Sequence, residues 1–272
     1  MSLITITENI GCGGMEIANI AADALKLELY DDRKLEEKAT ELGLRAEDLK
    51  AIEEKVPGFF SLLLSYKPEA YLDLLQAVVY EVAREGQGII LGHGSQILLR
   101  DFGCAMHVRI HASDSNRISY LIDQKGLARD SAQKMIHKSD SERRGFLRFA
   151  FHIDWNDPSQ YDLIINRDKL TIELAAKIII EAARSDEIKE CSLTALESME
   201  KLSLTRKIEA AILKDNLAPD SIHIEVTERG VAHITGFTYT REYKDRLLKV
   251  VKNVPGVQDV QSSVVVLPAG LG

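Results

Sequence analysis

The sequence has few of the residues that mark a secreted or a membrane protein. Its 272 residues include only three cysteines, Cys12, Cys104 and Cys191, which are scattered and form no C-x-x-C pair. This pattern indicates neither a disulfide framework nor a zinc site, and it suits a reducing compartment. No run of roughly 18 apolar residues is present, and Leu3–Ile6 follows the first methionine without a basic flank. We therefore expect a cytoplasmic protein without an export signal or membrane insertion.

The chain also lacks an excess of positive charge. Lysine and arginine number 34 against 42 aspartates and glutamates, which gives a net charge of −8. A general binder of nucleic acid or of anionic membranes needs a dominant basic field, so neither partner is expected. Aromatic residues make up only 6% of the chain, but the hydrophobic fraction of 45% is enough for one large core or two smaller ones.

Short apolar runs alternate with helical patterns through the first two thirds of the chain. Strands are predicted at residues 3–6, 27–30, 88–92, 106–110 and 162–165. Helices are predicted at residues 17–25, 32–42, 46–55, 71–85 and 170–183, with a break at Pro57-Gly58. Strands separated by helices predict a parallel sheet of the α/β class.

The last third of the chain carries a different order of elements. Helix 205–214 is followed by strands 222–228 and 231–237, helix 240–251 and strand 257–267, which gives an α+β module of the αββαβ type. The segments K-I-E-A-A-I, R-G-V-A-H-I-T-G and P-G-V-Q-D-V stand in this order. Through them, residues 204–268 resemble the BON domain family. The charged stretch 186–203 is then a linker or a bridging helix, after a first domain of residues 1–185.

A glycine-rich turn separates the first predicted strand from the first helix. Gly11, Gly13 and Gly14 lie in it, and the main-chain N–H groups of such a turn can hold a phosphate at a helix N-terminus. The pattern G-x-x-x-x-G-K-[ST] also needs a lysine and a hydroxyl. With Gly13 as its second glycine, Glu8 stands at the first glycine, and Gly14 and Met15 stand at the lysine and the hydroxyl. The loop fails this pattern, and a simple tight turn is the alternative.

A basic stretch precedes the last strand of the first domain. From Arg117 to Arg148, eight lysines and arginines stand against four acidic residues. Such a cluster could clamp a polyphosphate, with Arg143 and Arg117 as the preferred cations. The alternative is a solvated helix with paired charges, for example Asp140 with Arg143 or Arg144.

Four segments carry a resemblance to a known family. They are G-C-G-G-M-E at residues 11–16, Y-D at 30–31, L-G-H-G at 91–94, and D-S-E-R-R-G-F-L-R-F-A-F-H-I-D-W-N-D-P-S-Q-Y-D-L-I-I-N at 140–166. The last segment is the most specific. Through these motifs, residues 1 to about 185 resemble the cytidylate-kinase-like family of P-loop proteins. The resemblance implies a three-layer P-loop kinase-like fold with a parallel sheet and a helical lid, with ATP and Mg²⁺ as cofactors.

The chain departs from the family pattern at four positions, three of which are cationic in the family. Met15 and His93 each replace an arginine, Ser141 replaces a lysine and Arg167 replaces a threonine. Removing one cation that neutralises phosphoryl oxygens can lower a transfer rate by several powers of ten. The resemblance implies ATP-dependent phosphoryl transfer to a nucleoside monophosphate or a related small acceptor, by a nucleotide kinase whose degenerate loop lacks the lysine. The alternative is a non-catalytic nucleotide-sensing regulator whose BON-like domain binds a partner or ligand.

Site residues follow from the motifs and the resemblance. The predicted catalytic residues are Arg143, Arg117 and Asp31; the phosphate-binding residues are Gly11, Gly13, Gly14, Met15 and Glu16; and the substrate-binding residues are His93, Arg144 and Asp140. No metal-binding residues are predicted. Asp31 could instead cap the next helix, and His93 could fill the core or a loop. A nucleotide is the expected partner, and the sequence is also compatible with a homo-oligomer.

Overall fold

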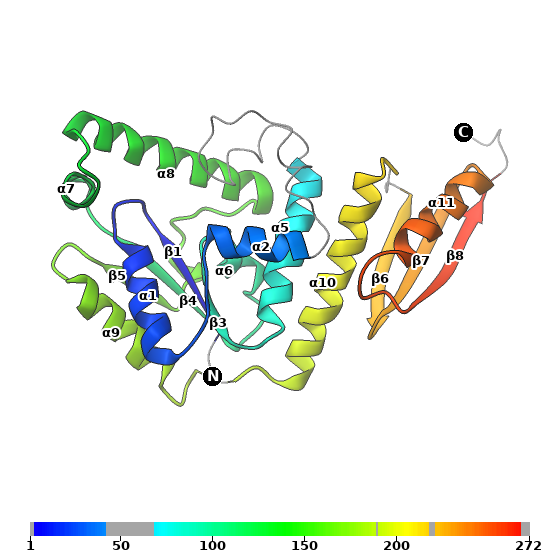
Figure 1. The fold of residues 1–272 in the computed structure, drawn as a ribbon, viewed down its shortest axis with the longest axis horizontal. Helices are drawn as coiled ribbons and strands as arrows, with labels where there is room; N and C mark the ends of the chain where they lie inside the picture. Colours follow the sequence, from blue (N-terminus) through cyan, green and yellow to red (C-terminus); the bar gives the residue numbers. More distant parts are fainter. Residues whose placement is uncertain (1–2, 42–67, 189, 218–220, 268–272) are drawn as a thin grey trace. The chain divides into compact units, whose positions relative to one another are not determined.

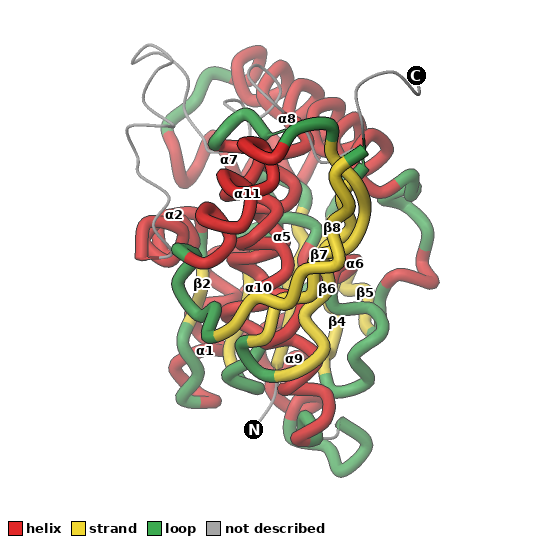
Figure 2. Tube along the Cα trace, turned by 90° about the vertical axis from the view of Figure 1, so that its right-hand side faces the viewer, coloured by secondary structure: helices red, strands yellow, loops and turns green. Residues whose placement is uncertain are grey.

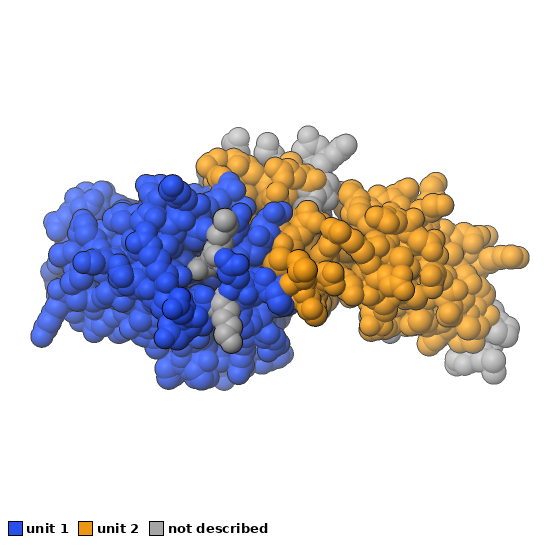
Figure 3. All heavy atoms as spheres, turned by 90° about the horizontal axis from the view of Figure 1, so that it is seen from below, with its two compact units in different colours: residues 1–31, 85–192 blue, residues 32–84, 193–272 orange. Residues whose placement is uncertain are grey.

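The computed structural model describes residues 3–41, 68–188, 190–217 and 221–267, which divide into two compact units. One unit comprises residues 1–31 and 85–192, and the other comprises residues 32–84 and 193–272, as coloured in Figure 3. The predicted helix at 46–55 and the break at Pro57-Gly58 lie outside the described residues.

The first unit is built around a parallel sheet of five strands (Figure 1). The strands are β1 (Leu3–Glu8), β2 (Leu29–Tyr30), β3 (Gly88–Leu91), β4 (Ala105–His111) and β5 (Leu163–Asn166), in the spatial order β2-β3-β1-β4-β5. The helices of this unit are α1 (Gly14–Leu25), α6 (Ser95–Leu98), α7 (Asp114–Lys125), α8 (Arg129–Phe151) and α9 (Ile172–Ala183), with a 3-10 turn at Pro158–Gln160. The predicted α/β class and all five strands are confirmed, although β2 is two residues shorter than expected.

The core of this unit explains why the apolar runs become central strands. Ile4 and Ile6 of β1 are fully buried, and they share one hydrophobic cluster with Ile17 of α1 and Ile179 of α9. Helix α1 begins directly after the glycine turn and carries alanines where it packs on α9. Since every strand runs in the same direction, the carboxyl ends of β1, β3 and β4 meet at one edge of the sheet.

The second unit combines a helix pair with a three-stranded sheet. Its elements are α2 (Asp32–Glu41), α5 (Pro68–Ala83), α10 (Leu193–Lys214), β6 (Ile222–Glu228), β7 (Val231–Thr238), α11 (Arg241–Lys252) and β8 (Asp259–Val266). Strand β7 lies between β6, to which it is antiparallel, and β8, to which it is parallel (Figure 2). The inward residues Ile224, Ile234 and Val264 pack on α10 and α11 in one cluster. The predicted αββαβ order is confirmed, and the stretch 193–203 is the first half of α10.

Helix α5 precedes β3 in the sequence, but it packs on α10 in the second unit. Ser203 is buried between them, and its hydroxyl, which has one proton to donate, lies 3.2 Å from the Ala77 carbonyl oxygen and 3.0 Å from Glu81 Oε2. Lys207 Nζ lies 2.8 Å from the same Glu81 oxygen, and both side chains are almost fully buried. The Ser203 contacts and the Glu81–Lys207 ion pair therefore hold α5 and α10 together.

We expect Glu81→Gln to destabilise the second unit by about 2 kcal/mol at pH 7, because Lys207 loses its buried anion. Burial raises the pKa of Glu81, but the bond and charge of Lys207 and the charge of Arg84 outweigh it, so the pKa is lowered. A carboxyl with a lowered pKa stabilises the fold above its unfolded pKa and loses that contribution as the pH falls through the folded pKa. The difference in melting temperature between wild type and variant should therefore shrink on acidification below pH 4. A difference that stays constant from pH 7 to pH 3 would contradict this.

Two of the three cysteines are bonded to each other. Cys104 and Cys191 form a disulfide with Cα atoms 4.8 Å apart, so the expectation that the scattered cysteines indicate no disulfide is wrong for this pair. The two residues are 87 positions apart in sequence, and only the fold brings them together.

In the part of the chain that the structure describes, we find no helix with the length and apolar character needed to cross a membrane.

Candidate functional site

The glycine turn lies at the carboxyl end of the central strand β1, where α1 begins. Gly13 caps α1 in a left-handed conformation with φ of 71°, and Gly11 has φ of 87°. A Cβ atom at Gly11 would lie 2.9 Å from the carbonyl oxygen of Arg117. The turn therefore needs glycine at both positions, for its backbone conformation and for its contact with α7.

The side chain of Glu8 occupies the N-terminus of α1. Glu8, the last residue of β1, accepts a hydrogen bond from the Gly14 main-chain N–H through Oε2 at 2.7 Å. The guanidinium of Arg143 donates to the carbonyl oxygen of Glu8. A helix N-terminus beside an arginine is the environment that binds an anion. The position expected for a phosphate therefore already holds a carboxylate.

The electrostatics of Glu8 reflect this position. Burial raises the pKa of Glu8, the charge of Arg143 and the Gly14 hydrogen bond lower it in part, and the charge of Glu16 raises it further. The net shift is upward, so the charged form of this carboxyl is disfavoured where it sits. A dianionic phosphate at this position would also lose hydration through burial, and the negative charge of Glu8 would repel it.

The remaining residues of the turn are either exposed to solvent or chemically unreactive. Met15 and Glu16 are exposed, and the Glu16 carboxylate accepts a hydrogen bond from the Tyr120 hydroxyl on α7. Cys12 is buried, and burial raises the pKa of its thiol to about 12. Neither Met15 nor Cys12 therefore offers a cation, an ammonium or a reactive thiolate to a phosphate.

Arg117 and Asp140, predicted for catalysis and for substrate binding, are each other's partners. Arg117 is 2% exposed and donates to both oxygens of Asp140, each at 2.8 Å. Its Nε donates to the Ile10 carbonyl oxygen at 2.8 Å, and Asp114 accepts a further bond at 3.1 Å. Asn9 also donates to Asp140, at 3.3 Å. These bonds tie α7 and α8 to the turn and neutralise the guanidinium.

Arg143 and Arg144, neighbours on α8, have different environments. Arg143 is half-buried and reaches the turn, whereas Arg144 is exposed. Helices α7 and α8 pack on each other through Ile118, Leu121 and Ile136, and they lie beyond the end of the sheet at which the turn sits (Figure 1). Of the two neighbouring arginines, Arg143 is thus the cation that this helical pair presents to the loop.

His93 and Asp31 lie at the same edge of the sheet as the turn, at different distances along it. His93 is buried in a left-handed conformation with φ of 62°, two residues beyond β3, which neighbours β1. The next residue, Gly94, leaves no room for a Cβ atom, which would lie 2.9 Å from the ring of Phe151 on α8. Asp31 follows β2, which β3 separates from β1. Both predicted roles remain predictions.

A hollow of about 480 Å³ opens beside the turn in the same unit. Its lining includes Tyr120 of α7, Arg167 after β5 and Ile172 of α9, and the Arg167 guanidinium lies 5.3 Å from the Tyr120 ring centre. A Cβ atom at Gly13 would contact both Ile172 and Tyr120, so the hollow borders the turn directly. It offers a planar aromatic surface and a cation next to the helix N-terminus.

The residues near the turn fit an anion better than they fit a metal ion. The Gly14 N–H already binds a carboxylate oxygen. Met15, which stands at the hydroxyl position of the phosphate-loop pattern, has no oxygen to offer magnesium. Within the described residues there is no cluster of three or more histidine, cysteine, aspartate or glutamate side chains suited to a metal. The side chain of Met15 therefore cannot replace the hydroxyl that holds magnesium in that pattern.

Sequence reasoning missed three residues of this site. Glu8 was counted only as a mismatch to the first glycine, and Tyr120 and Arg167 were not assigned to a binding surface. The signal for Glu8 was available, because an acidic residue ends a buried strand five residues before the capping glycine. The signal for Tyr120 and Arg167 was not, because 46 residues that include α8 and β5 separate them.

Comparison with known proteins agrees with this architecture. Residues 3–169 match the model of the cytidylate kinase-like family, and residues 201–268 match the BON domain. An uncharacterized protein from Eubacterium ventriosum is similar in structure, with a TM-score of 0.53 and 20% identity over 66% of this chain and 97% of that one. No curated protein of comparable sequence is found.

Two kinases are among the weaker structural matches. A shikimate kinase from Bacteroides thetaiotaomicron has a TM-score of 0.40 and 16% identity, covering 68% of this chain and 99% of its own. A gluconokinase from Sinorhizobium meliloti 1021 has a TM-score of 0.41 and 12% identity, covering 66% and 94% respectively.

Proposed function

Since the chain belongs to the cytidylate kinase-like family, we propose that its first unit binds a nucleoside triphosphate such as ATP and works as a nucleotide sensor. One observation carries this proposal: the Glu8 carboxylate accepts the Gly14 N–H at the start of α1. A side-chain oxygen already accepts a hydrogen bond at the helix N-terminus, so the geometry there suits an oxygen acceptor such as a phosphate. A phosphate can bind only by displacing Glu8, which makes binding conditional.

The chain's own residues would hold the nucleotide at two points. The Gly14 N–H and the Arg143 guanidinium, which now meet Glu8, would bind phosphate oxygens. The hollow beside the turn would take the base against Tyr120 and Arg167, since an aromatic ring and a guanidinium both stack on a planar base. ATP supplies the phosphates in this arrangement, and the protein supplies orientation.

Phosphoryl transfer needs more than this site contains. Gly14 stands where the phosphate-loop pattern has its lysine, and Asp140 neutralises Arg117. Each missing cation at the phosphoryl oxygens removes several powers of ten in rate. Binding without turnover is therefore the role that these residues support best.

The second candidate function is ATP-dependent phosphoryl transfer to a nucleoside monophosphate or a related small acceptor. One observation favours it: Arg143 lies on a helical pair of the lid type and reaches the turn. In this reading Arg143 would neutralise phosphoryl oxygens, and the acceptor would bind near His93 and Asp31. Magnesium would then have to be held without side chains from the turn.

Calorimetric titration followed by a turnover assay separates the two functions. We expect ATP to bind, and we expect no ADP release above background with CMP or dCMP as acceptor. Arg143→Ala should weaken ATP binding roughly tenfold, as loss of a charge-assisted bond does, whereas Arg144→Ala is the matched control with little effect. Turnover that Arg143→Ala abolishes would favour the kinase, and failure of ATP to bind would contradict both functions.

A further inference from the structure

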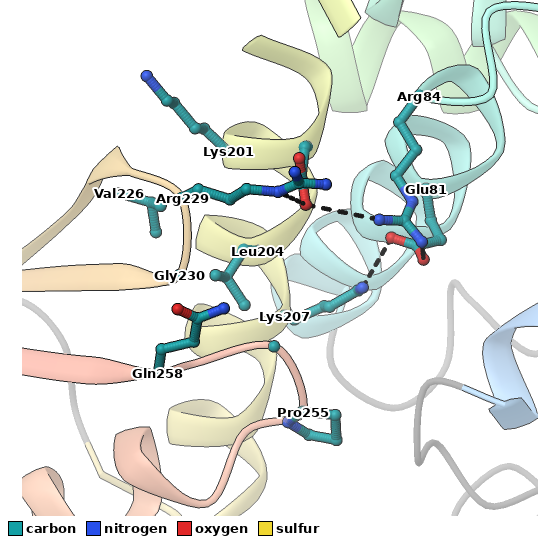
Figure 4. A pocket seen from close by; sticks show the side chains of 12 residues that line it. Glu81, Arg84, Lys201, Leu204, Lys207, Val226, Arg229, Gly230, Pro255 and Gln258 are labelled. Carbon is teal, nitrogen blue, oxygen red and sulfur yellow. Dashed lines mark hydrogen bonds and ion pairs between the residues drawn. The ribbon is translucent and has the colours of Figure 1, made fainter. Parts of the chain in front are cut away.

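The second unit contains a cavity of about 380 Å³ between a helix pair and two loops (Figure 4). Helix α5 contributes Glu81 and Arg84 to its wall, and α10 contributes Glu200 and Lys207. The turn between β6 and β7 adds Arg229, and the loop between α11 and β8 closes the remaining side. Five of the charged side chains that line this partly open cavity therefore come from three separate elements.

The charges in this cavity are linked in a chain of ion pairs. Lys207 and Arg84 lie 2.8 Å and 2.9 Å from the oxygens of Glu81. Arg229 Nε lies 3.0 Å from Glu200 Oε1, and Arg84 approaches the same oxygen at 3.7 Å. Figure 4 shows these pairs meeting across the cavity from α5, α10 and the β6–β7 turn. Three cations share two carboxylates, so these five side chains carry a net charge of +1.

Lys201 adds a fourth positive charge at the rim. It lines the cavity, and its side chain extends away from the others in Figure 4. The local charge of the lining is then +2, inside a chain whose net charge is −8. A phosphate monoester carries about −1.5 to −2 at neutral pH, which matches this excess.

Two arginines can donate hydrogen bonds to a ligand in the cavity. Arg229 is largely exposed, and the only ion pair assigned to it among the described residues uses Nε, which leaves its two terminal nitrogens for a ligand. Arg84 Nη1 approaches Glu200 Oε1 only to 3.7 Å, which is beyond hydrogen-bond distance, so this nitrogen can donate to a ligand instead. A guanidinium with spare N–H groups binds phosphoryl oxygens in a bidentate manner.

Apart from Gln258, the uncharged side chains of the lining are apolar. Leu204, Val226 and Pro255 provide hydrophobic surface, and Gly256 lies so near Leu204 that an added Cβ atom would be 3.3 Å from its methyl group. A ligand here would meet cations at one side and hydrocarbon at the other. The cavity thus suits an anionic head with a compact apolar body.

We propose that this cavity is a binding site for a small phosphate monoester with an apolar body. The phosphoryl group is held by Arg229 and Arg84, and the body packs on Leu204, Val226 and Pro255. Residues 201–268 match the BON domain, and α5 precedes them by more than a hundred residues. The site therefore exists only because α5 and the BON domain are fused in one unit.

Phenyl phosphate is a suitable probe, because it carries both chemical features and is not a nucleotide. Titrated calorimetrically into the full chain, it should bind, whereas phenol should not, and added salt should weaken the binding. Arg229→Gln should reduce the affinity roughly tenfold. Arg246→Gln is the matched control, because Arg246 is also an exposed arginine of the second unit with a carboxylate partner, Asp215, at 2.9 Å. Circular dichroism melts should show both variants folded.

A substitution with the opposite effect makes the test stricter. Glu200→Gln removes the carboxylate that holds Arg229 and should strengthen phenyl phosphate binding severalfold, which a purely structural role of Glu200 would not produce. Equal affinities of Arg229→Gln and Arg246→Gln would overturn the proposal. So would weaker binding by Glu200→Gln, or the absence of binding at about 10 mM probe.

Discussion

Asp140→Asn is expected to lower the free energy of unfolding of the first unit by about 4 kcal/mol. The guanidinium of Arg117 is almost fully buried, and Asp140 receives two of its hydrogen bonds at 2.8 Å. Asparagine keeps the size of the side chain but removes the charge, so a buried cation is left with only the more exposed Asp114 as an anion. Thermal unfolding followed by circular dichroism should show a fall of roughly 10 °C in the melting temperature.

The control for this experiment lies on the same helix. Glu142→Gln also removes one negative charge from α8, but Glu142 is exposed and lies 3.8 Å from an exposed Lys138. We expect less than about 0.5 kcal/mol from it, as for other surface pairs. The double variant Arg117→Met with Asp140→Leu should recover much of the loss, since apolar residues can replace a buried ion pair. Equal melting temperatures for Asp140→Asn and Glu142→Gln would contradict a structural role for the pair.

The fold could be predicted because its signals are local. The run Gly88–Leu91 is apolar and bounded by glycine, and the structure makes it a central strand next to β1. The alternation at Ile222–Glu228 gave a strand with the same limits in the structure. The pairing of α5 with α10 had no such signal, because it depends on a buried Ser203 and on a Glu81–Lys207 ion pair between residues 126 positions apart. Contacts of this kind leave no period in the sequence.

The site could be predicted in part for the same reason. The glycine turn was placed correctly, since glycine spacing is local and its positive φ angles follow from it. The cations around it were identified by type, but their partners were not. Arg117 was expected to face a phosphate, and it binds Asp140, which is 23 residues away on the next helix. Composition shows how many charges a lid carries, whereas the packing of α7 on α8 decides which of them are neutralised.

The second large effect is expected for Glu8→Gln, which should strengthen ATP binding roughly tenfold to a hundredfold, because a like charge a few ångströms from the phosphate is removed. Glutamine can still accept the Gly14 N–H, so the turn should keep its shape. Calorimetric titration of ATP at pH 7 measures the change. Glu16→Gln is the matched control: it removes the same charge from the first turn of α1, but at an exposed position where solvent screens it, and it should change the affinity far less.

The same variant tests the electrostatic role of Glu8 in the absence of a nucleotide. The pKa of Glu8 is raised by burial, so its protonated form stabilises the fold at low pH and that contribution is lost as the pH rises through the raised pKa. Glu8→Gln should therefore melt at or above the wild-type temperature at pH 7, and the two should converge on acidification. A residue that holds the loop together only through its charge would instead lower the melting temperature when neutralised. If Glu8→Gln lost both stability and ATP affinity, the carboxylate would be a structural or ligand-binding group and not an internal competitor of the phosphate.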